Sequence, residues 1–159
     1  MSLYDKEYED YDSPVDDIYP ETFYHQLRID LELHIDKLEI DSIDVPRLHH
    51  KYLSMKKRAK KHLEEIEIRH RTLTHNLQLY YEGRAADEEY KKRPLNLTLD
   101  KKDIDRFVKA ENAYKYSEKI VTLWRLRVEF LTKIVEQIGN RSYLIHNAIE
   151  YLKFTKGGD

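Results

Sequence analysis

Residues 45–83 read VPRLHHKYLSMKKRAKKHLEEIEIRHRTLTHNLQLYYEG, and an apolar or small residue returns at every seventh position of this stretch. These positions are Val45, Tyr52, Ala59, Ile66, Leu73 and Tyr80. A repeat of seven places them on one side of a helix that packs against a partner helix. The spacing predicts a helix over 45–82, with Asp44 as its N-cap, Pro46 in its first turn and Gly83 as its C-cap.

A second repeat of seven runs through residues 101–138 and has no charged side chain in its seam. Its members are Phe107, Ala110, Tyr114, Ser117, Val121, Trp124, Val128, Leu131, Val135 and Ile138. We expect one helix over this range, capped by Asp100 and ended by Gly139, and a separate final helix from about Ser142 to Phe154. The fold class that follows is all-α, a long helical hairpin with coiled-coil-like packing plus a C-terminal helix.

The rest of the chain gives weaker signals. A short helix is expected from Glu21, and the alternation of apolar and polar residues over 36–44 predicts an extended or strand-like segment. Residues 83–99 are expected to form a loop with one helical turn at 87–92. We divide the chain into an arm (1–20), a DNA-binding part (21–99) and a part for the core and oligomerisation (100–159).

The C-terminal third has more apolar surface than one hairpin can bury. A second apolar set spreads around the helix predicted over 101–138, and the final helix is apolar nearly all round. We therefore expect a homo-oligomer assembled through this part of the chain. The residues expected at its interface are Trp124, Phe130, Ile134, Tyr143, Ile145, Ile149 and Leu152.

Charge is divided unevenly along the chain. The formal net charge of −2 is the sum of −11 over residues 1–44 (14 acids, 3 bases) and +9 over residues 45–159 (16 acids, 25 bases). A basic body favours a polyanion as partner, although a solvated helix surface explains the same imbalance equally well. Lys60 and Lys61 have a glutamate four residues on, whereas residues 56–58 (KKR) have no acid four residues away on either side, which makes these three the better anion contacts.

Residues 1–20 read MSLYDKEYEDYDSPVDDIYP, with seven acids, one lysine and four tyrosines. No helical or strand period is visible, and this composition predicts a disordered arm. An acidic, aromatic arm of this kind resembles a nucleic acid in its charge. We therefore hypothesise that it competes for the basic groove, so that its deletion tightens DNA binding.

Several kinds of chemistry have no residues to support them. The chain has no cysteine, and its four glycines compose neither a GxxxxGK loop nor a GxGxxG fingerprint. The eight histidines form no HExxH motif, and no nucleophile arrangement is recognisable. We predict a protein that is not an enzyme, with no cofactor, no metal and no catalytic residue. No apolar run approaches the roughly 20 residues of a membrane span, so we expect no membrane contact.

Three segments together resemble a known family. They are VPRLHHKY (45–52), LYYEGRA (79–85, a YYxG[KR] ending to the basic helix) and NRSYLIHNAIEYLKF (140–154). In this order and spacing they resemble the UvsY-type recombination mediator proteins of large tailed phages, over roughly residues 22–157. The resemblance implies a helical, ring-like homo-oligomer that binds single-stranded DNA without catalysis, with its C-terminal helices holding the oligomer together.

The resemblance also implies a role and a site. Such mediators help to load a RecA-like phage recombinase onto DNA coated by a single-strand-binding protein, in recombination, repair and recombination-dependent replication, here in the cytoplasm of the infected bacterial host. The residues predicted to contact DNA are Lys56, Lys57, Arg58, Lys60, Lys61, Arg69, Arg71, His75, Tyr81 and Arg84. Tyr81 is the expected platform for base stacking, with Tyr80 in the helix seam. The alternative is a helical scaffold or adaptor oligomer whose basic face binds an acidic protein.

Overall fold

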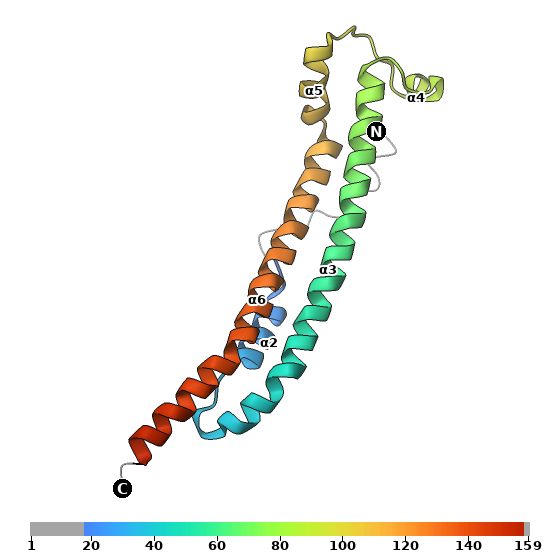
Figure 1. The fold of residues 1–159 in the computed structure, drawn as a ribbon. Helices are drawn as coiled ribbons and strands as arrows, with labels where there is room; N and C mark the ends of the chain where they lie inside the picture. Colours follow the sequence, from blue (N-terminus) through green and yellow to red (C-terminus); the bar gives the residue numbers. More distant parts are fainter. Residues whose placement is uncertain (1–17, 158–159) are drawn as a thin grey trace. The chain divides into compact units, whose positions relative to one another are not determined.

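The computed structural model describes residues 18–157, a range that consists of helices and connections without a strand (Figure 1). The elements are α2 (Glu21–Leu31), the 3-10 helix η2 (Ile35–Lys37), α3 (Leu38–Tyr81), α4 (Asp87–Lys92), α5 (Lys101–Ala110) and α6 (Asn112–Lys156). The predicted all-α class is confirmed, and so is the helical turn predicted at 87–92. The prediction of a disordered arm over 1–20 falls, except for its last three residues, outside the described range.

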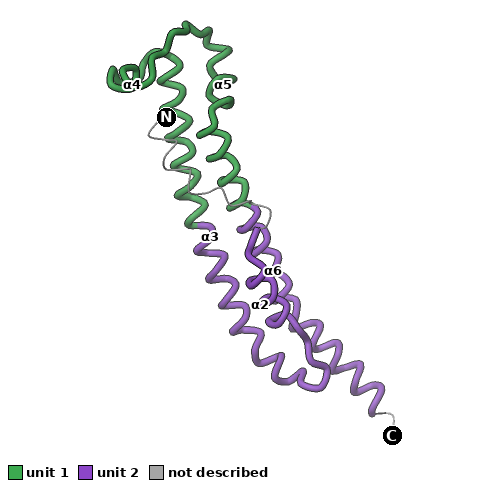
Figure 2. Tube along the Cα trace, turned by 180° about the vertical axis from the view of Figure 1, so that it is seen from behind, with its two compact units in different colours: residues 1–16, 61–125 green, residues 17–60, 126–159 purple. Residues whose placement is uncertain are grey.

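The described residues divide into two compact units, which Figure 2 colours separately. Unit 1 contains residues 61–125, and unit 2 contains residues 18–60 together with 126–157. Within unit 1, α3 and α6 run antiparallel, because Glu67 contacts Arg125 while His70, further along α3, contacts the earlier residue Ser117. Unit 1 is thus built on a helical hairpin.

The α3 seam, which repeats every seven residues, is buried as predicted. Its six members, Val45, Tyr52, Ala59, Ile66, Leu73 and Tyr80, are all at most 9% exposed. Three residues after a seam residue the helix presents the same side again; of these positions, Leu48 (after Val45) is buried but His62 (after Ala59) is exposed. His62 lies with its ring 4.2 Å from the ring of Trp124, so a polar ring takes the place of an aliphatic side chain against α6.

The start of α3 differs from the prediction. The helix begins at Leu38, and Pro46 lies inside it, so neither the extended segment over 36–44 nor the cap at Asp44 is formed. Leu38 and Asp41 are buried on the face that continues to the seam, which is a helical and not an alternating pattern. Pro46 removes one helical hydrogen bond, but Pro46 and Ser42 are both exposed, so water can bind the carbonyl oxygen of Ser42.

The helix α3 ends where Gly83 predicts that it should. Gly83 has φ +75°, the left-handed region that side chains with a Cβ rarely adopt. Its N–H donates to the carbonyl of Tyr80 (3.2 Å), and the N–H of Arg84 donates to the carbonyl of Leu79 (2.9 Å). These two bonds form a Schellman motif, which confirms Gly83 as the C-cap residue.

The helix predicted over 101–138 is interrupted and also runs further than predicted. Glu111 is extended (φ −62°, ψ 135°) and separates α5 from α6. Gly139 does not end α6, and the predicted separate C-terminal helix is instead the last part of this long helix. A glycine costs a helix roughly 1 kcal/mol relative to alanine. Ile138 and Ile145 are at most 2% exposed, so burial on both sides of Gly139 outweighs that cost.

Each unit has a local cluster of contacts that stabilises it. In unit 1 a hydrophobic core joins the end of α3 to α5 and the start of α6, with the 83–99 loop packed on it; its buried members are Leu73, Leu77, Tyr80, Tyr81, Ile104, Val108 and Tyr114. In unit 2, α2 is held on α3 by the Asp30 carboxylate, which accepts hydrogen bonds from Lys51 and from the Tyr52 hydroxyl (2.7 Å).

Candidate nucleic-acid interface

The basic segment of α3, residues 56–60, has the sequence KKRAK and belongs to unit 2. Lys57, Arg58 and Lys60 are exposed and Lys56 is half-buried, whereas Ala59 is buried in the seam. Its single small residue therefore faces the core, and its four cations cover the remaining directions of more than one helical turn. Lys61, exposed in the next position, extends the run into unit 1.

The described part of the chain offers no carboxylate partner to the cations of this segment. Other bases of the same helix have one, since Arg47 pairs with Asp44 (2.5 Å) and Lys51 pairs with Asp30. Between residues 18 and 157, no carboxylate lies within 4 Å of Lys56, Lys57, Arg58, Lys60 or Lys61. The predicted i,i+4 pairing of Lys61 with Glu65 is thus not formed, and Glu65 lies 3.8 Å from His62. The segment keeps its positive charge available to an anion.

A second group of predicted contacts lies in unit 1. Arg69, Arg71 and His75 are exposed along α3. The Nε of Arg71 lies 3.4 Å from the carbonyl oxygen of Glu67, and Arg84, just past the glycine cap, pairs with Glu82 at 3.3 Å. Arg84 is therefore partly neutralised, while the other three side chains project into solvent from the helix.

Tyr81 does not occupy the position predicted for it. Its ring is 8% exposed and packs in the unit 1 core, 5.6 Å from the ring of Phe107. Its hydroxyl donates to the carboxylate of Glu111 and accepts from Arg93 (3.2 Å). A base cannot stack on a ring enclosed in this way, so the expectation of a stacking platform at Tyr81 is wrong. Tyr80 is buried in the seam, as predicted.

Sequence reasoning missed the polar cluster to which Tyr81 belongs. Arg93 donates to Glu111 at 2.6 Å and lies over the ring of Tyr80 at 4.9 Å. Burial, and then the hydrogen bond to Glu111, raise the pKa of Tyr81 to about 12. The only signal in the sequence was Glu111 itself, a charged residue beside the seam position Ala110, at the point where the helix is interrupted.

The residues predicted for oligomerisation divide into two groups. Ile134 and Ile145 are buried in unit 2, and Phe130 packs against the rings of Phe23 (6.4 Å) and Tyr24 (5.8 Å). Trp124 is half-buried against His62 in unit 1. These four side chains therefore have contacts within their own chain.

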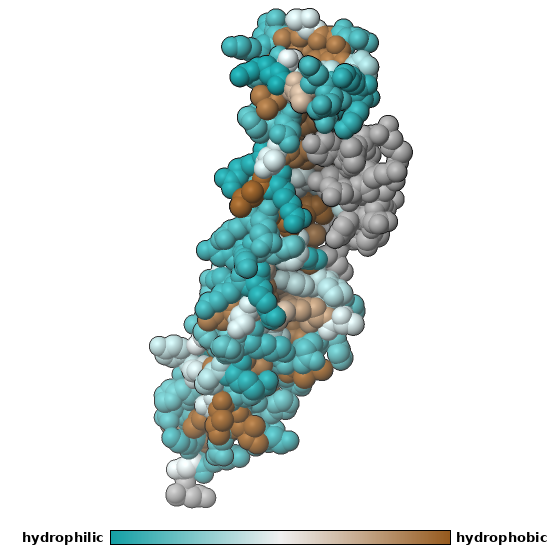
Figure 3. Space-filling view, turned by 90° about the vertical axis from the view of Figure 1, so that its right-hand side faces the viewer, coloured by the Kyte–Doolittle hydropathy of each residue, from teal (hydrophilic) through white to brown (hydrophobic). Residues whose placement is uncertain are grey.

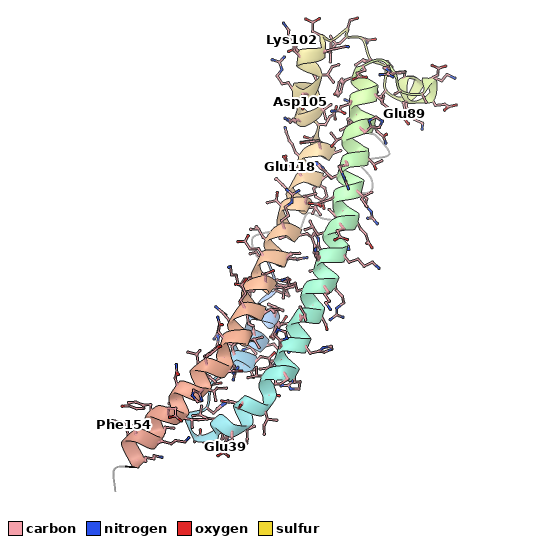
Figure 4. The ribbon with its side chains drawn as sticks, in the orientation of Figure 1. Glu39, Glu89, Lys102, Asp105, Glu118 and Phe154 are labelled. Atoms are coloured by element: carbon pink, nitrogen blue, oxygen red, sulfur yellow. The ribbon has the colours of Figure 1, made fainter. Side chains whose placement is uncertain are left out.

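The C-terminal part of α6 is exposed. Tyr143 is 73% exposed, and the neighbouring Leu144, Tyr151 and Phe154 are also exposed. Figure 4 labels Phe154, which projects from the last turns of α6 into solvent. Ile149 and Leu152 are half-buried and line a groove of about 390 Å³ against residues 35–39. Figure 3 shows hydrophobic side chains gathered near this end of the chain.

Residues 18–157 contain no group of three or more His, Asp or Glu side chains arranged to hold a metal ion. Within the same range, no helix is both long enough and apolar enough to cross a membrane.

Comparisons with known proteins place the chain. Residues 25–158 match the profile of the family described as "Recombination, repair and ssDNA binding protein UvsY". Among solved structures, crystal forms of the bacteriophage T4 recombination mediator protein UvsY are similar. The lattice type II structure has a TM-score of 0.72 at 17% identity, covering 88% of this chain and 98% of that one. Lattice type I has a TM-score of 0.74 at 18% identity, covering 84% and 98%. A search of curated protein sequences found no significant match.

Proposed function

We propose, from the premise that this chain belongs to the UvsY family of recombination, repair and single-stranded-DNA-binding proteins, that it is a recombination mediator whose basic segment on α3 contacts the DNA. The observation that supports this site is the absence of any carboxylate partner for Lys56, Lys57, Arg58 and Lys60 in residues 18–157. Four cations in five residues, three of them exposed and one half-buried, form a contact surface for phosphates.

The mode of binding follows from these side chains. Lysine is a flexible point charge, and contacts of this kind to phosphates give affinity without sequence preference and with a steep dependence on salt. Arg69 and Arg71 offer further cations on α3, His75 offers an exposed imidazole, and Arg84 follows the glycine cap. We include these four as secondary contacts. Because Tyr81 is buried, base stacking on it has no part in the proposal.

The proposal includes assembly into a ring-like homo-oligomer. The exposed apolar side chains of the C-terminal part of α6, among them Tyr143, Tyr151 and Phe154, support an interface there. Ile149 and Leu152 line the neighbouring groove. Several protomers on one strand multiply weak individual sites by avidity, which suits a protein that must hold a flexible polymer.

The proposed role is to load a RecA-like recombinase onto DNA that is coated by a single-strand-binding protein, by binding alone and without a catalytic step. The DNA-bound oligomer would hold the strand while the recombinase replaces the coating protein. This finer role rests on family membership and not on any contact surface identified on this chain.

The test compares two triple variants of the full chain by fluorescence anisotropy with a labelled single-stranded oligonucleotide. K56Q/K57Q/K60Q removes three cations of the basic segment. K101Q/K102Q/K119Q removes three exposed cations that have no carboxylate within 4 Å in residues 18–157. Glutamine keeps the helix propensity close to that of lysine. We expect the first variant to lose on the order of 10-fold in affinity at low salt, and its log–log salt slope to fall by about 2.

Two results would contradict the assignment. Equal losses in the two variants would show that only net charge matters and that the basic segment is not the contact. No binding of single-stranded DNA by the parent chain at low salt would refute the function itself and favour a scaffold whose basic face binds an acidic protein. A duplex of equal length serves as the control for strand preference.

A further inference from the structure

Unit 2 contains a cluster of aromatic rings where α2 packs against α6. Tyr19 precedes α2, Phe23 and Tyr24 lie on α2, and Phe130 lies on α6. The centroids of neighbouring rings in this cluster lie between 4.2 and 6.4 Å apart. All four residues are half-buried, whereas a core residue of the same unit such as Leu48 is 1% exposed. The cluster therefore reaches the surface of the unit.

Tyr24 is the ring of this cluster on which a further flat group can stack. Tyr19 and Phe23 are already stacked on each other, with 21° between their planes, and the Arg127 guanidinium lies over the Tyr19 ring at 5.4 Å. Tyr24 instead meets Phe23 and Phe130 at steep interplanar angles, 81° and 70°. Within residues 18–157, no ring is stacked parallel to Tyr24 and no cation lies over it. The ring is thus held in place by its neighbours without having a stacked partner.

The cluster adjoins the basic segment, which belongs to the same unit. The ring of Phe23 meets the ring of Tyr52 edge-on at 6.5 Å, so the cluster contacts α3. Lys56 lies four residues after Tyr52, one turn or about 6 Å further along the helix on the same side. Successive phosphates of a stacked strand are about 3.4 Å apart. A strand held at Lys56 therefore reaches the cluster within on the order of four nucleotides.

We propose that Tyr24, held by Phe23 and Phe130, is a platform on which a base of single-stranded DNA stacks while the basic segment binds neighbouring phosphates. Every base has a flat π-face, so stacking adds affinity without a sequence preference. The bases of a duplex are already stacked on one another, so the platform favours single strands, which lysine contacts to phosphates alone do not. This inference rests on the proposed function, because it takes the contact of the basic segment with DNA as given.

The first experiment detects the stacked base in the parent protein. A single-stranded oligothymidylate that carries 5-iodouracil at one position is bound at low salt and irradiated. Irradiation breaks the carbon–iodine bond and joins the base to an aromatic side chain stacked on it. We expect a cross-link to Tyr24, identified by mass spectrometry of the peptides. Oligonucleotide that is bound without any cross-link to Tyr24, with the halogenated base moved through every position in turn, would overturn the proposal.

The second experiment separates the contribution of the bases from that of the phosphates. Tyr24→Leu removes the ring, and Tyr24→Phe keeps it as the matched control. Anisotropy measures the affinity of each variant for a labelled oligonucleotide and for a strand of abasic sites, which has the same phosphates. We expect Tyr24→Leu to lose on the order of 10-fold in affinity for the normal strand and little for the abasic strand, and Tyr24→Phe to match the parent on both. Equal losses on the two strands, or no loss, would contradict the platform.

The two proposals fail in different ways. K56Q/K57Q/K60Q should weaken binding of the normal and the abasic strand alike, because it removes contacts to phosphates. If the parent binds neither strand, the proposed function is wrong and the platform fails with it. If the parent binds both strands equally tightly, the function stands and the platform is wrong. This comparison and the cross-link use only the parent chain, so they decide the question even if Tyr24→Leu does not fold.

Discussion

The helix ends on the loop side of unit 1 and those on the η2 side of unit 2 are stabilised by different contacts. In unit 1, Tyr81, Arg93 and Glu111 bond to one another over a buried core, so the end of the hairpin is closed by its own side chains. In unit 2, a single buried arginine binds the end of α2, while apolar residues such as Ile35 and Phe154 remain exposed. The first region covers most of its apolar side chains with its own residues, whereas the second leaves apolar side chains exposed.

The sharpest way to break this comparison is to remove the buried arginine of unit 2. Arg141 is 5% exposed and donates to the carbonyls of Asp30 (2.8 Å) and Glu32 (2.6 Å), with Asp41 at 3.8 Å. Arg141→Ala leaves these groups buried or poorly paired, and we expect a loss of about 3–5 kcal/mol in the free energy of unfolding. Urea denaturation measures it, with the exposed Arg106→Ala as the control. A loss below 1 kcal/mol would show that α2 does not depend on Arg141.

A smaller loss in the free energy of unfolding is expected from a change on the loop side of unit 1. Tyr81→Phe keeps the ring and removes the hydroxyl between Glu111 and Arg93, at a cost of about 1–2 kcal/mol. The pKa of Tyr81 is raised to about 12 by burial, so its contribution is complete below pH 10 and is lost as the pH rises toward 12. Above pH 10, the free energy of unfolding of the variant should therefore fall less steeply with rising pH than that of the parent.

The dependence of stability on pH in acid tests the contact between α3 and the residues that precede it. The backbone N–H of His34 donates to Asp41 at 2.7 Å, and this bond, ahead of the other contacts, lowers the pKa of that carboxyl. A lowered pKa means stability that is present above the ordinary pKa and lost as the pH falls below it. Asp41→Asn should be less stable at neutral pH and should show a flatter decline below pH 4. Thermal unfolding at several pH values measures this, and an unchanged acid limb would contradict the role of Asp41.

The smallest effect on the stability of the protomer is expected from changes in the exposed C-terminal part of α6. Tyr151→Ser with Phe154→Ser alters side chains that are 68% and 85% exposed, so the protomer should unfold within about 0.5 kcal/mol of the parent. Sedimentation should nevertheless show a smaller particle, because the proposed interface loses its apolar contacts. Leu97→Ser, at an exposed apolar residue of unit 1, should leave assembly unchanged. Assembly that survives the double variant would place the interface elsewhere.

The predictable part of the fold is the part set by local spacing. The α3 seam and the Gly83 cap follow from a repeat of seven and from a left-handed residue, and both are observed. Pro46 and Gly139 were misread as helix boundaries, because burial of Leu38 on one side and Ile145 on the other decides whether a helix continues. Such contacts join residues far apart in the chain, and no local pattern contains them.

In the candidate site, too, local features were predictable and contacts between distant residues were not. The exposed cations of the basic segment are visible in sequence, since neighbouring charges four residues apart can be counted. Tyr81 was misassigned because its partners, Arg93 and Glu111, are 12 and 30 residues away and meet it only in the folded chain. Whether a tyrosine faces solvent or core at the end of an amphipathic helix depends on the loop that packs over it.

The basic segment also has a consequence for proteolysis. Lys56, Lys57, Arg58 and Lys60 are adjacent tryptic sites, placed in the middle of a 44-residue helix. A protease cleaves an extended chain and not an intact helix, so cutting here requires α3 to open locally. The rate of tryptic cleavage at these bonds is thus a gauge of helix opening that the chain already contains, and any molecule that occupies the segment will slow it.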